Sequence, residues 1–211
     1  WASTCPTGAA LVEMTLPLRK LVVDEHNVRR NNLAQGKLPR YETARRMATM
    51  QWSPQMAPLA ELNVKQCLMK HDACHNTPKF RASGQNLAIF KYSGASSSRT
   101  NQQLITSAIT MWWNERVNAN QAVMASYPAT WTGGDIGHFT VMARQNNYAV
   151  ACAAARYVVS GENYFLIACN YATTNVVGKA TYNVGKTAAG CTTGTNVNYA
   201  GLCKVGEAYN V

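Results

Sequence analysis

The chain has 211 residues, enough for one domain around a single hydrophobic core, and its 20 Lys and Arg residues against 10 Asp and Glu residues give a formal net charge of +10. Charged residues make up only 14% of the chain and seven residues are cysteine, which favours an oxidising, extracellular compartment over the cytosol. No apolar run is long enough to span a bilayer and no polybasic block is present, so we expect neither a membrane span nor a nucleic-acid partner.

Four helices are predicted in chain order. An irregular N-terminal arm at residues 1–16 precedes a helix over residues 17–35, and a second helix covers residues 54–71; each begins with a proline, which suits the first turn. A third helix covers residues 102–120, and a short fourth helix begins at Gly137. Four apolar residues of the first helix are expected to share one face with Glu25: Leu18, Leu21, Val22 and Val28.

Three strands are predicted between the helices. Residues 85–92 form the first strand, and residues 150–159 and 164–171 form a hairpin. Two loops rich in small and turn-forming residues lie at 93–101 and 121–134. Helices that alternate with antiparallel strands argue for a layered α+β fold.

Two runs in the second half carry the strongest signal, Asp135–Asn147 and Leu166–Asn175. They resemble the two signatures of the CAP superfamily, which includes the cysteine-rich secretory, venom antigen 5 and plant pathogenesis-related 1 proteins. The second run resembles the insect antigen 5 branch and, within it, the dipteran proteins. Further runs agree with the same pattern: Val22–Arg30, Met47–Trp52, Ala60–Val64, Gly84–Leu87 and Trp112–Glu115.

The resemblance implies a three-layer α-β-α sandwich with a small antiparallel sheet between helices and a central cleft. It divides the chain into an N-terminal arm (1–16), a CAP domain (17–182) and a cysteine-pinned C-terminal extension (183–211) packed on that domain.

The resemblance also implies three disulfides, which join Cys5 to Cys67, Cys152 to Cys169 and Cys191 to Cys203. One cysteine, Cys74, is left over. An odd cysteine in a secreted protein either stays free or pairs with another molecule. The sequence leaves both alternatives open, and the second predicts a disulfide-linked homodimer.

Candidate metal ligands follow from the same resemblance, which matches His71, His138 and Glu115 to the two histidines and one of the two acids of the family's cleft. The other acid is replaced here by Gln85, which cannot ionise and binds cations more weakly than Glu. Two neutral imidazoles and one carboxylate remain adequate for zinc or copper with open water positions. We therefore expect weak Zn or Cu binding, with no cofactor required; the alternative is a polar cluster that only fixes the loops around the cleft.

Cys67, His71, Cys74 and His75 are ligand-type residues close in sequence, but we do not expect them to form a metal site. On one continuous helix the first and last of these residues lie about 12 Å apart, too far to share an ion. Cys67 is also assigned to a disulfide by the resemblance.

Relatives in the antigen 5 branch hold fatty acids or eicosanoids between helices. The residues that could line such a lipid channel here are Val22, Leu104, Ala108 and Met111, although the same spacing is typical of ordinary core positions. In the adjacent pair Trp112–Trp113, only one ring is expected to face the core.

The sequence favours a binding protein over an enzyme, because it has no Gly-x-Ser-x-Gly, His-Glu-x-x-His or phosphate-loop motif. The predicted function is that of a secreted, salivary antigen 5-like protein that modulates host immunity or haemostasis. Its predicted partner is a host plasma or immune protein, or a small lipid mediator. The alternative is a Cu- or Zn-dependent redox or enzyme-like activity in the His71/His138 cleft.

Overall fold

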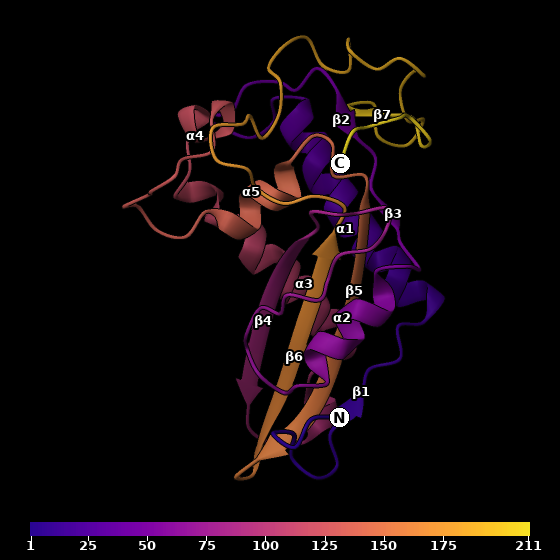
Figure 1. Cartoon of the computed structure of the whole chain (residues 1–211), viewed down its shortest axis with the longest axis vertical. Helices are drawn as coiled ribbons and strands as arrows, with labels where there is room; N and C mark the ends of the chain where they lie inside the picture. The colour runs from indigo at the N-terminus through magenta and orange to yellow at the C-terminus, as the bar shows by residue number, and fades with distance from the viewer.

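A sheet with antiparallel main strands forms the middle layer of the protein in the computed structural model, which describes residues 1–211 (Figure 1). Its strands follow the order β1-β5-β6-β4. The short strand β3 pairs in parallel with β5 on the edge opposite β6, where it lies at the start of β5 and β1 lies further along the same edge. The bounds are β1 Ala10–Leu11, β3 Gln51–Trp52, β4 Gly84–Tyr92, β5 Ala149–Val159 and β6 Glu162–Tyr171.

The β5–β6 hairpin is the longest pairing in the sheet, and a two-residue turn sets its register. Ser160 and Gly161 both have positive φ angles, 50° and 80°, which the tight turn between right-handed twisted strands requires. This register places Cys152 opposite Cys169, where the two form a disulfide across the strands.

Helices cover both faces of the sheet, so the predicted three-layer α-β-α sandwich is confirmed (Figure 1). Strand residues alternate between the two faces. Cys152 and Ala154 face the main core with α1, α3 and α5, whereas Ala153 and Ala155 face α2. The helices are α1 Leu16–Ala34, α2 Ala57–Val64, α3 Asn101–Asn114, α4 Gln121–Ala125 and α5 Gly137–Ala143, with 3₁₀ turns at Ser96–Ser98 and Glu115–Val117.

The buried face of α1 is more polar than the sequence suggested. Val28 of the predicted apolar face is 46% exposed, while His26 and Arg30 are fully buried. Arg30 has no acidic partner; its guanidinium donates hydrogen bonds of 2.7–3.3 Å to backbone carbonyls of residues 48, 142, 144 and 145. These bonds satisfy the donors of a buried cation and join α1 to the chain that follows α5.

Two predicted helices end earlier than expected. The helix predicted over 54–71 stops at Val64, because the chain turns out at Cys67, which has a φ of +53° and is bonded to Cys5. The helix predicted over 102–120 stops at Asn114 and tightens into a 3₁₀ turn. Its start is well defined, since Thr100 and Gln103 form a reciprocal capping box.

The last 29 residues wrap over one end of the sandwich (Figure 1). There β7 (Leu202–Cys203) pairs in parallel with β2 (Met47–Ala48), and the hydroxyl of Thr49 donates to the carbonyl of Cys203 at 2.6 Å. A third disulfide joins Cys191 to Cys203. Cys74 is exposed and forms no disulfide, and no helix has the length and apolar character to cross a membrane.

Candidate functional site

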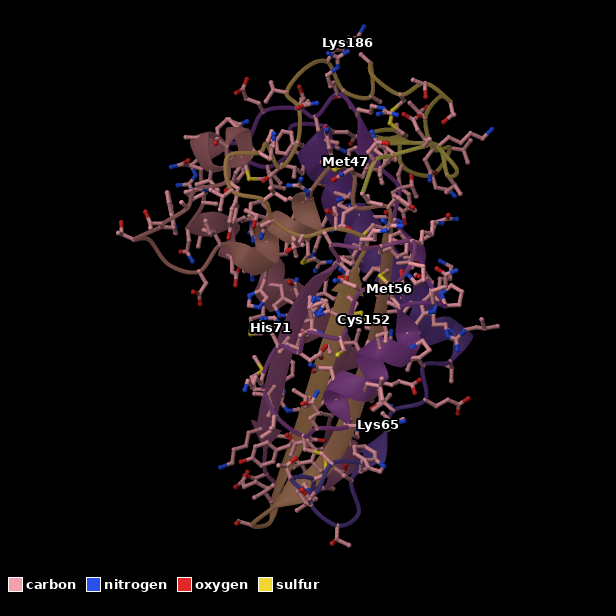
Figure 2. All side chains as sticks on the ribbon, viewed as in Figure 1. Met47, Met56, Lys65, His71, Cys152 and Lys186 are labelled. Atoms are coloured by element: carbon pink, nitrogen blue, oxygen red, sulfur yellow. A yellow bond between two sulfur atoms is a disulfide. The ribbon has the colours of Figure 1, made fainter.

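A polar pocket of about 250 Å³ brings the two predicted histidine ligands together at one edge of the sheet. His71 enters from the irregular segment after α2, beside β4 (Figure 2), and His138 enters from the first turn of α5. The other lining residues are Gln85, Asn86, Asp135, Gly137, Val141, Thr174 and Asn175.

Glu115 fixes His138 and the start of α5 at the same time. One carboxylate oxygen accepts from the backbone N–H groups of His138 at 2.8 Å and Phe139 at 3.1 Å, which lack partners inside the helix. The other oxygen lies 2.5 Å from Nδ1 of the His138 ring. Nδ1 therefore carries the proton toward Glu115, and the lone pair of His138 lies on Nε2. The ring also stacks near Trp112, with centroids 6.0 Å apart.

Gln85 holds His71 in a similar way. Its side-chain oxygen lies 2.9 Å from Nδ1 of His71, and its amide nitrogen donates to the side-chain oxygen of Asn170 at 3.0 Å and to Asp72 at 3.3 Å. Because the Gln85 oxygen can only accept, Nδ1 of His71 is the donor and Nε2 keeps the lone pair. Gln85 thus orients an imidazole without adding a charge.

A buried chain of hydrogen bonds runs from the pocket into the core. Asn86 donates at 3.3 Å both to the carbonyl of His138 and to the hydroxyl of Tyr171. Tyr171 in turn donates to Nε2 of His26 at 2.9 Å, and Nδ1 of His26 donates to the carbonyl of Val22 at 2.7 Å. Burial lowers the pKa of His26 to about 3, so this ring is neutral at physiological pH. Sequence reasoning passed over Asn86 and Tyr171 as site residues, although both stand inside the motif runs.

These contacts test how well the pocket fits a divalent metal. Two imidazoles with Nε2 lone pairs are suitable donors for zinc or copper. Glu115 is committed to three hydrogen bonds and is placed to orient His138. Asp135 also lines the pocket, and its carboxylate makes no hydrogen bond or ion pair. Sequence reasoning missed Asp135, which carries the uncommitted carboxylate of this pocket.

A tighter group of ligand-type atoms elsewhere is not a metal site. The sulfur atoms of Cys191 and Cys203 and a carboxylate oxygen of Glu207 all lie within 4.8 Å of one another. The ligand-type atoms of His71, His138 and Glu115 do not form so tight a group. However, the two sulfurs are bonded to each other in a disulfide, so neither is a thiolate, the form that ligates metals. Likewise Cys67 is bonded to Cys5, so it is not available to the cluster of Cys67, His71, Cys74 and His75 that the sequence analysis excluded. The reason given there was wrong, because α2 ends at Val64 and these residues do not lie on one continuous helix.

The four residues predicted to line a lipid channel do not share one environment. Val22, Leu104 and Ala108 are buried in the main core, whereas Met111 is 46% exposed. The expectation that only one ring of the tryptophan pair is buried was also wrong. Trp112 and Trp113 are 0% and 5% exposed, and Trp113 packs edge-on against Phe139 with centroids 5.0 Å apart.

Residues 23–171 match the family model of CAP, the cysteine-rich secretory protein family. The chain belongs to this family. Venom allergen-1 of Aedes albopictus is 33% identical to this CAP protein over 205 residues, which span 96% of this chain and 78% of the relative. The antigen 5 like allergen Cul n 1 of Culicoides nubeculosus is 41% identical over 164 residues, 78% of this chain and 72% of the relative. The predicted resemblance to dipteran antigen 5 proteins is thereby confirmed.

Solved structures share the fold of this chain. A crystal structure of NaASP2 with Zn²⁺ superposes on this CAP protein with a TM-score of 0.71 at 24% identity, covering 95% of this chain and 100% of that chain. At this identity the likeness establishes the fold.

Proposed function

We propose that this CAP protein is a secreted, salivary antigen 5-like binding protein that modulates host immunity or haemostasis by binding a host plasma or immune protein. We propose in addition that His71 and His138 bind a divalent metal, zinc or copper, through their Nε2 atoms. The names of the Aedes and Culicoides relatives, both allergens, support exposure to a host's immune system. Three disulfides support an extracellular location.

The observation that carries the proposal is the state of the two imidazoles in the pocket. Each has its Nδ1 engaged, by Glu115 or by Gln85, and neither hydrogen-bonds to a hydroxyl or a thiol. An imidazole must contact such a group to activate it as a nucleophile. The arrangement therefore favours ligand binding over nucleophilic catalysis.

A host protein is favoured over a small lipid mediator as the partner. Three of the four residues considered for a lipid channel are packed into the core and are not available to a ligand without repacking. By contrast, residues 93–100 and 126–134 are largely exposed on a disulfide-pinned scaffold, which is where recognition residues are usually found. The loop predicted over 121–134 is shorter than expected, because its first five residues form α4.

Capture from plasma tests the proposal. Immobilised protein is exposed to whole plasma at physiological salt, and the retained proteins and lipids are identified by mass spectrometry. We expect a specific plasma protein. A retained fatty acid or eicosanoid without any protein would show that the protein scavenges a lipid mediator and does not bind a host protein. Retention of nothing specific would refute host binding.

The metal is tested separately by calorimetric titration with zinc and with copper. His71→Ala/His138→Ala should abolish binding, while His75→Gln, which removes an imidazole outside the pocket, should leave it unchanged. Equal titration of the wild type and the double variant would refute the metal site. A copper-dependent redox role is the second candidate, favoured by the same two Nε2 donors. Superoxide removal that needs added copper and disappears in the double variant would establish it.

A further inference from the structure

A surface groove beside β3 shares no residue with the histidine pocket. It consists of three adjoining hollows of about 340, 160 and 460 Å³, all lined by Lys79, and we call it the Lys79 groove. The first hollow lies against the C-terminal segment 204–209, the second against Trp52 and Phe80, and the third against Pro58 and Leu59 at the start of α2.

Aromatic rings form much of the wall of the Lys79 groove. The Lys79 ammonium lies 5.4 Å from the centroid of Phe80 and 5.5 Å from that of Tyr148. Tyr148 stacks on Tyr209 with centroids 6.3 Å apart and planes 26° apart. Such a wall offers flat apolar surface to aromatic or proline side chains of a partner.

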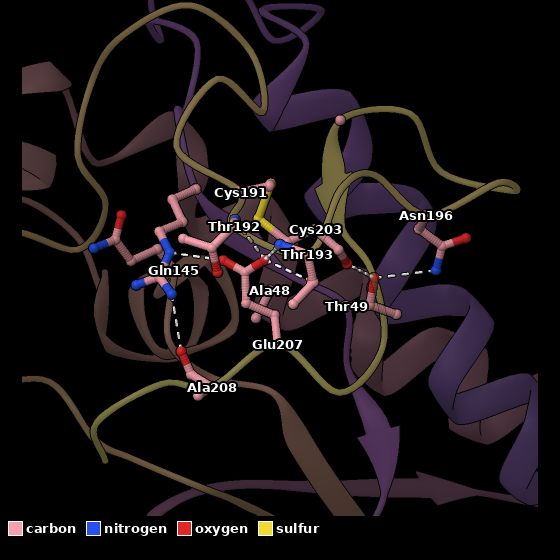
Figure 3. The surroundings of a disulfide bond; sticks show 12 residues. Ala48, Thr49, Gln145, Cys191, Thr192, Thr193, Asn196, Cys203, Glu207 and Ala208 are labelled. Carbon is pink, nitrogen blue, oxygen red and sulfur yellow. Dashed lines mark hydrogen bonds and ion pairs between the residues drawn. A yellow bond between two sulfur atoms is a disulfide. The ribbon is translucent and has the colours of Figure 1, made fainter.

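The free charge of the groove is positive. Lys79 and Lys204 are exposed, and neither ammonium group forms an ion pair or a hydrogen bond. The acid of the groove, Glu207, has a fully buried side chain that accepts from Arg46 at 2.7 Å and from the backbone and hydroxyl of Thr193 at 3.0 and 2.8 Å. Figure 3 shows Glu207 beside Thr192 and Thr193, next to the Cys191–Cys203 disulfide. Its charge is thus neutralised inside the protein, and two ammonium groups are left to face a ligand.

We propose that the Lys79 groove binds an extended acidic peptide segment of a protein partner, with carboxylates at Lys79 and Lys204 and aromatic or proline side chains against the half-buried rings of Trp52 and Tyr148. The three adjoining hollows extend from the C-terminal segment to the start of α2, which gives room for several residues of a peptide. Charge complementarity selects acidic segments over neutral ones. The inference rests on the proposed binding of a host protein and names the chemistry of one contact.

A library of linear peptides displayed on phage, panned against the disulfide-intact wild-type chain, tests the proposal. We expect enrichment of peptides that combine Asp or Glu with aromatic or proline residues. The affinity of the most enriched peptide should fall at least about tenfold in Lys79→Glu/Lys204→Glu. Lys91→Glu/Lys186→Glu changes the net charge equally but lies outside the groove, and should bind like the wild type.

Two results would overturn the groove: no enrichment of acidic peptides, or equal loss of affinity in both double variants. The peptide and plasma experiments separate the two proposals. A plasma protein that is captured equally by Lys79→Glu/Lys204→Glu leaves host binding intact and removes the groove. Peptide binding at the groove without any capture from plasma removes host binding instead.

Discussion

Replacing His26 by Gln should flatten the loss of stability that this protein suffers in mild acid. His26 is fully buried between α1 and β6, and its pKa is lowered to about 3 from an ordinary value of 6.5. Burial is the main cause and Arg30 adds to it, while the hydrogen bond to Val22 opposes it. A Gln side chain can still donate and accept at this position, but it does not titrate.

The sign and size follow from proton linkage. Between pH 6.5 and 3 the unfolded chain binds a proton at His26 that the folded chain does not, so the free energy of unfolding falls as the pH falls through this window. At about 1.36 kcal/mol per pH unit, the loss between pH 7 and 4.5 is roughly 2.6 kcal/mol. His75, whose pKa is also lowered by burial, contributes with the same sign and remains in the variant.

Denaturant unfolding with intact disulfides at several pH values between 7 and 4.5 measures this effect. The wild type should lose roughly 2.6 kcal/mol more than His26→Gln over the window. Tyr171→Phe serves as the control, because it removes one hydrogen bond to His26 but keeps the titrating ring. It should be less stable by about 1 kcal/mol and retain the slope. Parallel curves for the wild type and His26→Gln would falsify the reasoning.

Four further predictions concern single features. Arg30→Lys should cost about 2–5 kcal/mol in chemical denaturation, since one ammonium cannot reach the carbonyls that the guanidinium joins, while Arg81→Lys at the surface should cost under about 1 kcal/mol. Glu115→Gln should weaken zinc binding about 10–100-fold by calorimetry, because the single acceptor oxygen of Gln cannot hold both the α5 backbone N–H groups and Nδ1 of His138; an unchanged affinity would contradict that role. Cys191→Ser/Cys203→Ser should lower the free energy of unfolding by roughly 3 kcal/mol and open the C-terminal segment to limited proteolysis. Exposed Cys74 should give a disulfide-linked dimer band on a non-reducing gel that Cys74→Ser removes, and monomer alone in the wild type would exclude the dimer.

Local patterns were sufficient for the three long strands β4, β5 and β6, but they gave no signal for the two-residue strands β1 and β3 at the edge of the sheet. Strand signals and the Ser160–Gly161 turn fix β5 and β6, because a two-residue turn determines which residues pair. The early end of α2 was not predictable in this way. It depends on the disulfide from Cys5, more than 60 residues away, which acts on a stretch that is locally compatible with a longer helix.

The polar core was missed for a different reason. An apolar stripe predicts which helix face is buried only when the buried residues are apolar, and on α1 the buried face includes His26, Asn27 and Arg30. Their burial is compensated by partners on β6, on the segment around Met50 and at the end of α5. The Lys79 groove was also not predictable from local patterns, because its residues come from four separate parts of the chain, near 51, 79, 148 and 204.

The pocket holds its two histidines in two different ways. His138 is held by Glu115, which comes from the end of α3 and also caps α5, so its orientation is tied to the packing of two helices. His71 lies on an exposed, irregular segment and depends on Gln85 of β4, whose amide is in turn held by Asn170 of β6. A neutral amide is sufficient for this second task, because orienting Nδ1 requires an acceptor and not a charge. Compared with a Glu at this position, Gln85 therefore adds no negative charge that would favour a cation, but it still engages Nδ1 of His71 and leaves its Nε2 available.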